Sequence, residues 1–401
     1  MKLLLAGAVA LAANMAPSAR AADPERPISQ AMSDLQRLQT QMALGDKGAY
    51  LLQRDRLRAI GVAILAAKPE TWKDKSETDA AVAYVLSGGQ PRVIGQLLAK
   101  GDIPASEEPL MRGAEDYVAG RQAEAEALLG DIDSSKASLR LAGQLAFAQS
   151  VLKTTSDPKG AIALLDRARL LAPGGLVEEA ALRREILLLG DQRVRDGVVL
   201  LARQYVTRFG HSIYAEDFIQ GLAATTVRYG LADDLPSLEK FQPLFTTVTP
   251  EVRRSFLLTI ARAQTLNGKP EVAGAAAREA LQDMPTGGSD ETRGKLFEAA
   301  ARMLTSDYEG GLATLQSLDR SSLSKPDQSL LDAAIFVAAR LRDPATLKVV
   351  TEVAREQPET VSPETNSTEA EAGASVPATL RLGAAALGRT ASLARGEGTR
   401  P

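Results

Sequence analysis

The sequence predicts an all-α protein built from paired helices that pack as helical hairpins, and three observations support this fold class. Strong helix formers such as Ala, Leu, Arg and Glu dominate, whereas aromatic residues make up only 4% of the chain. Apolar residues recur at helical spacing from about residue 33 to residue 353. Gly, Pro and Asp interrupt this pattern at short intervals, and no stretch keeps the alternation that is typical of a strand.

The first two predicted helices lie in residues 33–67. Ser33 begins a helix in which Leu35, Leu38 and Met42 share one face, and residues 45–48 break it. The apolar face of the next helix is predicted to hold six large residues. They are Leu51, Leu52, Leu57, Ile60, Ile64 and Leu65.

Four later segments follow one template, in which a helix ends at a Gly or Asp turn and an Ala-rich helix follows. They are residues 107–129 with a turn at Gly120, 139–171 at Asp157, 252–281 at Gly268 and 292–318 around Gly310. Small residues let the two helices of a hairpin cross closely, and large residues fill the space between hairpins. We therefore expect a solenoid of degenerate tetratricopeptide-like repeats. The repeat consensus is mostly missing, so an irregular helical bundle is the alternative.

Residues 1–21 have the pattern of a signal peptide. Lys2 supplies the positive charge, and residues 3–13 form an apolar run that is too short to span a bilayer. Ala19 and Ala21 place small side chains at the positions that a signal peptidase reads. We expect an exported mature chain that starts near Ala22 and, without any cysteine, relies on its core rather than on disulfides.

The remaining chain divides in two by composition. Residues 22–356 are predicted to form the all-helical repeat domain. Residues 357–401 are predicted to be a disordered tail, with an acidic linker followed by a basic terminus. The linker is rich in Glu, Thr, Ser, Pro and Ala and has almost no large apolar residue, so it cannot bury enough surface to order itself.

The sequence contains few of the residues and motifs that form catalytic sites. It lacks cysteine, a phosphate-binding loop and the Gly-x-Ser-x-Gly motif, and its single histidine, His211, falls in a predicted surface turn. Adjacent carboxylates at 107–108, 178–179 and 233–234 fall at predicted helix starts, where they favour the helix dipole, and Trp72 is expected to anchor a helix junction. We therefore predict no catalytic, cofactor-binding or metal-binding residue and no small-molecule substrate.

Charge argues against nucleic acid as a partner. Removing Lys2 and Arg20 with the signal peptide takes the formal net charge from −3 to −5, and no basic face is evident. A helical solenoid instead offers a concave surface to a partner protein, with Arg and Tyr as anchors. The candidates are Tyr84, Tyr117, Arg121, Arg183, Arg184, Tyr205, Arg208, Tyr214, Arg253 and Arg254. For each of them, packing in the core or exposure to solvent is favoured over contact with a partner, so the partner-binding residues stay unknown.

Residues 204–218, with the sequence QYVTRFGHSIYAEDF, are the most distinctive segment. In this segment Phe209 is expected to close one helix and Ser212 to cap the next. Together with residues 161–188 and 255–281, the segment resembles the MotC family of periplasmic flagellar motility proteins of α-proteobacteria, which carry a chemotaxis label. This resemblance implies a non-catalytic protein that is required for flagellar motor rotation and binds the periplasmic part of the stator protein MotB. A periplasmic tetratricopeptide-like adaptor in envelope assembly or secretion is the alternative.

Overall fold

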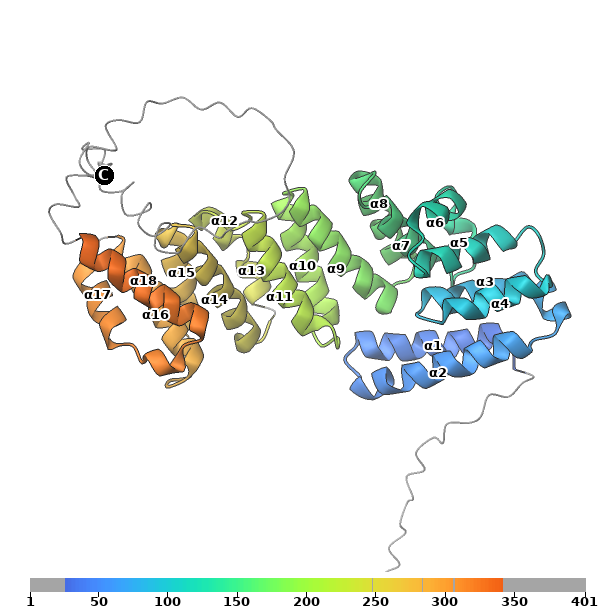
Figure 1. Cartoon of the computed structure of the whole chain (residues 1–401), viewed down its shortest axis with the longest axis horizontal. Coiled ribbons are helices and arrows are strands. Elements are labelled where there is room, and N and C mark those ends of the chain that lie inside the picture. The colour runs from blue at the N-terminus through green and yellow to red at the C-terminus, as the bar shows by residue number, and fades with distance from the viewer. Residues whose placement is uncertain (1–25, 247, 283, 306, 342–401) are drawn as a thin grey trace, which may run out of the picture. The chain divides into compact units, whose positions relative to one another are not determined.

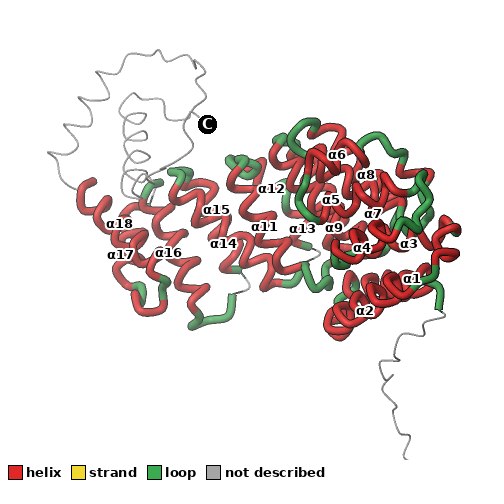
Figure 2. The backbone as a smooth tube through the Cα atoms, turned by 45° about the vertical axis from the view of Figure 1, so that its right-hand side comes forward, coloured by secondary structure: helices red, strands yellow, loops and turns green. Residues whose placement is uncertain are grey.

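The computed structural model describes residues 26–341 except 247, 283 and 306, and within them the predicted all-α fold is confirmed (Figures 1 and 2). The predicted signal peptide, residues 1–21, and the predicted tail, residues 357–401, lie outside the described residues. The contacts divide the chain into two compact units, Met1–Ala181 and Leu182–Pro401, which are taken in turn.

The first unit contains three hairpins and a helix that links two of them. The hairpins are α1–α2, α5–α6 and α7–α8, and α3 packs against both α1 and α5. The elements are α1 (Ile28–Ala43), α2 (Lys47–Ala66), η1 (Pro69–Lys73), α3 (Lys75–Leu86), α4 (Pro91–Lys100), α5 (Glu108–Val118), α6 (Gln122–Leu129), η2 (Ser134–Lys136), α7 (Ala142–Lys153) and α8 (Pro158–Leu171). Trp72 in η1 is buried between these helices, as expected for the anchor of a junction.

In the second unit, each hairpin packs on the next. The elements are α9 (Leu176–Asp191), which starts before the boundary, α10 (Arg195–Phe209), α11 (Ala215–Arg228), α12 (Leu235–Glu239), α13 (Gln242–Phe245), α14 (Pro250–Leu266), α15 (Pro270–Leu281), α16 (Ser289–Met303), α17 (Tyr308–Ser317), η3 (Arg320–Ser322) and α18 (Lys325–Leu341). Helix α14 pairs with α15 and also contacts α16, and α16 pairs with α17 and also contacts α15. This stacking of consecutive hairpins is the packing of a solenoid.

Helix α1 starts five residues before the predicted position, at Ile28 instead of Ser33. The sequence around Ile28 has no local capping residue, because the cap comes from α3. One carboxylate oxygen of Glu77 accepts a hydrogen bond from the backbone N–H of Ile28 at 2.7 Å and from that of Ser29 at 3.3 Å. A buried carboxylate thus satisfies the free N–H groups of a helix that lies 49 residues away in the sequence.

The second correction concerns Gly310, which was expected at a turn but lies, with Gly311, inside α17. The turn comes earlier, and Asp307 caps the helix by accepting a hydrogen bond from the Gly310 N–H at 3.0 Å. At position 311 a glycine is needed because α16 and α17 approach each other closely there. A Cβ atom there would lie 2.7 Å from both the carbonyl oxygen of Ala299 and the backbone nitrogen of Met303. The two backbones of the α16–α17 hairpin therefore cross at this glycine.

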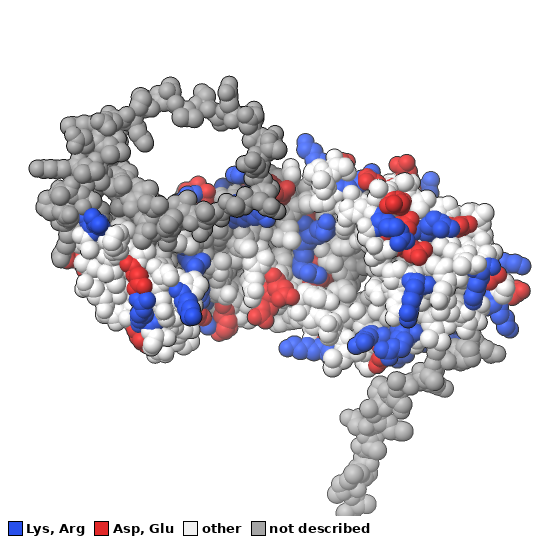
Figure 3. Space-filling view, in the orientation of Figure 1, with Lys and Arg blue, Asp and Glu red and all other residues white. Residues whose placement is uncertain are grey.

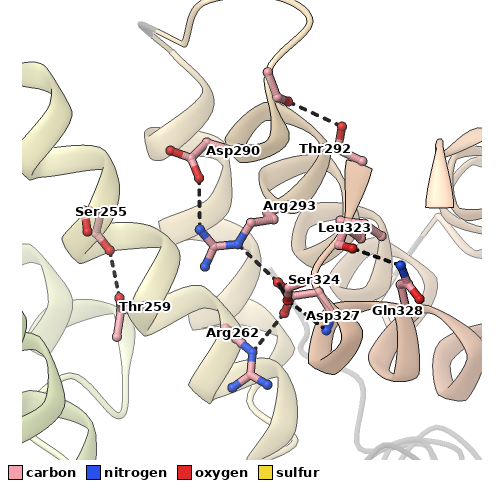
Figure 4. A network of polar contacts seen from close by, with 11 residues as sticks. Ser255, Thr259, Arg262, Asp290, Thr292, Arg293, Leu323, Ser324, Asp327 and Gln328 are labelled. Atoms are coloured by element: carbon pink, nitrogen blue, oxygen red, sulfur yellow. Dashed lines mark hydrogen bonds and ion pairs between the residues drawn. The ribbon is translucent and has the colours of Figure 1, made fainter. Parts of the chain in front are cut away.

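A buried carboxylate links three helices of the second unit (Figure 4). Asp327 on α18 accepts hydrogen bonds from Arg262 on α14 at 2.9 Å, from Arg293 on α16 at 3.2 Å and from Ser324 at 2.9 Å. The Asp327 side chain is 3% exposed, whereas both arginines reach solvent. Several donors on different helices satisfy its oxygens, so this buried side chain fixes the order of the hairpins.

Replacing Gly311 by Ala is expected to destabilise the protein by about 1–3 kcal/mol, because the new methyl group meets backbone atoms that cannot turn away. The control is Gly221→Ala in α11, where a Cβ atom meets nothing within 4 Å. That change is expected to stabilise the protein by about 0.4–1 kcal/mol, since it only restricts the unfolded chain. Denaturant unfolding of both variants measures the difference, and an equal effect of the two changes would contradict the close crossing.

Replacing Asp327 by Asn is expected to lower the free energy of unfolding by about 1–3 kcal/mol, because two arginines lose their buried counter-charge. Asp332→Asn on the same helix is the control. Asp332 pairs with Arg320 at the surface, and the hydrogen bond from this guanidinium holds the pKa of Asp332 below its usual value. Such an exposed pair contributes about 0–1 kcal/mol. Thermal and denaturant unfolding test both changes, and similar losses would contradict the linking role of Asp327.

Candidate interaction groove

The second unit contains a groove between the α10–α11 turn and the start of α14. Its volume is about 570 Å³. The lining residues come from the end of α10, the turn, the first half of α11 and the segment that leads into α14. They are Tyr205, Val206, Gly210, His211, Ser212, Ala215, Glu216, Ile219, Gln220, Val248, Thr249, Glu251, Val252 and Ser255. We call this the α11 groove, and it includes much of the distinctive segment 204–218.

Aromatic packing sets the wall of the α11 groove. The ring of Tyr205 on α10 lies 3.9 Å from that of Phe218 on α11 and 6.1 Å from that of Phe209, centroid to centroid. All three rings are buried. This cluster joins α10 to α11, and the short sequence between Phe209 and Ala215 turns the chain at the rim of the groove.

Ser212 has a different role from the predicted one. Phe209 closes α10 as expected, but the residue that precedes α11 is Tyr214, which provides no side-chain cap. The buried Ser212 hydroxyl instead accepts a hydrogen bond from the Tyr214 N–H at 3.2 Å. Ser212 therefore shapes the turn rather than the helix start, because it lies two residues too early to reach the first N–H groups of α11.

The groove has an apolar lining and a polar edge. Val206 and Ile219 are buried in the lining, whereas His211, Glu216 and Glu251 are exposed. Hydrogen bonds hold the pKa of Glu251 below its usual value, first from its own backbone N–H, then from the Thr249 hydroxyl and from Arg254. Such a surface suits the apolar side chains of a partner segment, with polar groups at the edge to orient it.

No metal-binding cluster of three or more His, Asp or Glu side chains exists among the described residues. The predicted surface position of His211 is confirmed, since this residue is exposed at the edge of the α11 groove. Among the acidic pairs, Glu108 is the first residue of α5 and Glu178 and Glu179 lie in the first turn of α9. Asp234 caps α12 by accepting a hydrogen bond from the Ser237 N–H at 2.8 Å.

The two buried tyrosine candidates pack in the core. Tyr84 is 2% exposed, and its hydroxyl oxygen accepts a hydrogen bond from the Gln90 N–H at 3.1 Å. Burial raises the pKa of this phenol. Tyr205 belongs to the aromatic cluster described above. Neither ring is available as an exposed anchor, which agrees with the packing role that the sequence favours.

Of the other eight candidates, Arg254 is buried and the rest are partly buried or exposed, and several have clear local contacts. Arg121 donates to Asp116 at 2.7 Å, and Arg254 to Glu251 at 3.3 Å. The guanidinium of Arg183 lies 4.8 Å from the centre of the Tyr214 ring, and that of Arg208 lies 5.6 Å from the Phe209 ring. The remaining three, Tyr117, Arg184 and Arg253, are half-buried. The structure brings Tyr205 to the α11 groove but does not gather these candidates into one site.

The apolar face predicted for α2 is partly wrong, because some of its large apolar side chains lie on the surface. Leu51 and Leu52 on α2 were expected to be buried, but their exposed fractions are 74% and 52%. Helix α2 is turned so that Ile60 and Ile64 enter the core, which leaves the side with Leu51 in solvent. Six leucine and isoleucine side chains cannot share one face at these spacings, and that mismatch was the available signal.

No helix in the described part of the chain is long and apolar enough to cross a bilayer.

The chain is similar to known proteins along nearly its whole length. The profile of the family described as "MotC: Chemotaxis protein MotC" matches residues 1–399. A curated relative from Rhizobium meliloti (strain 1021), named "Chemotaxis protein MotC", is 28% identical over 309 residues, which cover 76% of this chain and 70% of the relative. The family match includes every residue that lines the α11 groove.

Proposed function

The chain belongs to the MotC family of chemotaxis proteins, and we propose that it is a non-catalytic periplasmic protein that is required for flagellar motor rotation. In this role it binds the periplasmic part of the stator protein MotB. The family match over residues 1–399 carries the proposal, together with the signal-peptide pattern of residues 1–21.

The geometry supports a binding role for the second unit. Stacked helical hairpins form surfaces that take a partner's helix or extended segment. The α11 groove offers such a surface, with buried Val206 and Ile219 beside exposed polar residues. It also lies in the segment that carries the family resemblance. We therefore assign the stator contact to this groove.

Binding can regulate the stator without any chemistry. If the periplasmic part of MotB exists in a compact and an extended form, a protein that binds one form tenfold more tightly shifts their ratio by up to tenfold, or about 1.4 kcal/mol. A groove that recognises a segment accessible in only one form would give this preference. The protein then acts through differential affinity, as a scaffold rather than as a catalyst.

Blocking the α11 groove is expected to weaken MotB binding. Gln220 is exposed and lines the groove, so Gln220→Trp places a large ring in it without disturbing the core. We expect the Kd for the purified periplasmic part of MotB to rise at least tenfold, about 1.4 kcal/mol, in titration calorimetry. The matched control is Gln316→Trp on α17, which is exposed and outside the groove and should leave the Kd unchanged.

Two results would reject parts of this proposal. Wild-type protein that fails to bind the periplasmic part of MotB rejects the stator partner, and equal Kd values for the two variants reject the α11 groove as the contact. A deletion strain separates the motor role from that of an assembly adaptor. Cells that keep their filaments but do not swim support motor rotation, whereas cells without filaments support the adaptor.

A further inference from the structure

A second groove lies in the first unit, where α2 meets the turn between α3 and α4. Its volume is about 510 Å³. The lining residues come from the first half of α2, from Tyr84 at the end of α3 and from the turn that follows. They are Tyr50, Leu51, Gln53, Arg54, Leu57, Arg58, Tyr84, Gly88, Gly89 and Gln90. We call this the α2 groove, and it shares no residue with the α11 groove.

Large apolar side chains in the α2 groove face solvent. Tyr50 is 53% exposed and Leu51 is 74% exposed, although both lie on a well-formed helix whose other side is buried. The floor is firm, because Tyr84 is buried and its hydroxyl accepts the hydrogen bond from Gln90. A cluster of exposed apolar side chains over a rigid floor is typical of a surface that a partner covers.

The charge of the α2 groove has one sign. Arg54 and Arg58 line it, and no acidic residue does. They are four residues apart on α2, so their side chains lie on one face, separated by about one helical turn. Arg54 is exposed and has no ion-pair partner among the described residues. Arg58 contacts Asp55 at 3.1 Å in an exposed pair, which holds it only weakly.

The space-filling view also shows an excess of positive charge around α2. Figure 3 shows Lys and Arg side chains gathered over the α2 side of the first unit, with little acidic surface among them. Lys47 and Arg56 are also exposed on this helix. A guanidinium pairs best with a carboxylate, through two parallel hydrogen bonds. The charge of this surface is therefore complementary to an acidic partner.

We propose that the α2 groove binds a segment of a partner protein that carries two carboxylates about one helical turn apart beside large apolar side chains. The carboxylates pair with Arg54 and Arg58, and the apolar side chains cover Tyr50, Leu51 and Leu57. The hollow shape favours a protein segment over a membrane, because a bilayer needs a flat or protruding apolar face. The inference does not depend on which partner fills the α11 groove.

Site-specific photo-crosslinking in living cells tests the proposal. Benzoylphenylalanine replaces Leu51, which lines the α2 groove, or Leu52, which is exposed on the same helix but does not line it. We expect a discrete adduct from position 51 and none from position 52. Mass spectrometry should place the crosslink within an acidic, apolar segment of the captured protein.

Charge reversal then tests the role of the arginines. Arg54→Glu is expected to lower the adduct yield at least about tenfold, because like charges now face each other. Arg56→Glu makes the same change two residues away, outside the groove, and is expected to lower the yield by less than about twofold. Circular dichroism melting of the purified variants verifies the fold, and Arg54→Gln replaces Arg54→Glu if the latter unfolds.

Several results would overturn the proposal. They are similar adducts from positions 51 and 52, a yield that Arg54→Glu does not change, or a crosslinked segment without carboxylates. A crosslink to phospholipid or to the chain's own residues 342–401 would assign the groove to another occupant.

The same experiment in cells without MotB keeps the two proposals apart. An adduct that persists there identifies a different acidic partner and leaves the calorimetric test of the stator contact unaffected.

Discussion

The close approach of paired helices at small residues is the constraint on which the rest of the structure depends. A Cβ atom on Gly143 of α7 would lie 2.5 Å from the Cβ atom of Ala172, just beyond α8, and one on Gly113 of α5 would lie 2.7 Å from Leu129 of α6. A chain with few aromatic residues cannot fill wide gaps between helices, so it gains packing density by bringing backbones together. The α11 groove lies where such close backbone crossings are absent. Aromatic rings rather than glycines join α10 to α11, and Gly221 on α11 meets open space.

Buried polar side chains then determine which elements neighbour one another. Gln149 on α7 donates hydrogen bonds to the carbonyl oxygens of Leu129 and Ile132 at 2.6 and 2.7 Å, and Gln264 on α14 donates to that of Ala232 at 2.8 Å. Both units thus use a glutamine to satisfy carbonyl groups at the end of a preceding helix or in the loop beyond it. Such contacts give little net stability, but a wrong arrangement would leave the same groups buried without partners. They favour one order of hairpins over others.

Local signals in the sequence predicted the hairpins well and their long-range features poorly. The turns at Gly120, Asp157 and Gly268 are correct because each depends on residues within the turn itself. The start of α1 was wrong because its cap, Glu77, lies 49 residues away. Gly310 was misread because a glycine that permits close helix crossing looks the same in sequence as one that ends a helix. The α11 groove was only partly predictable, since Val252 reaches it from α14 and Val248 from the segment before α14.

The two grooves show how a hairpin stack can separate binding from stability. In such a stack each element contacts mainly its neighbours, so a surface can change without strain in distant hairpins. The α2 groove takes its charge from Arg54 and Arg58, which are exposed, while the buried Tyr84 forms its floor. The α11 groove likewise has exposed polar groups around buried Val206 and Ile219. On the two proposals above, specificity resides in exposed residues that contribute little to folding, and the core residues beneath them hold the surface in the shape that a partner would meet.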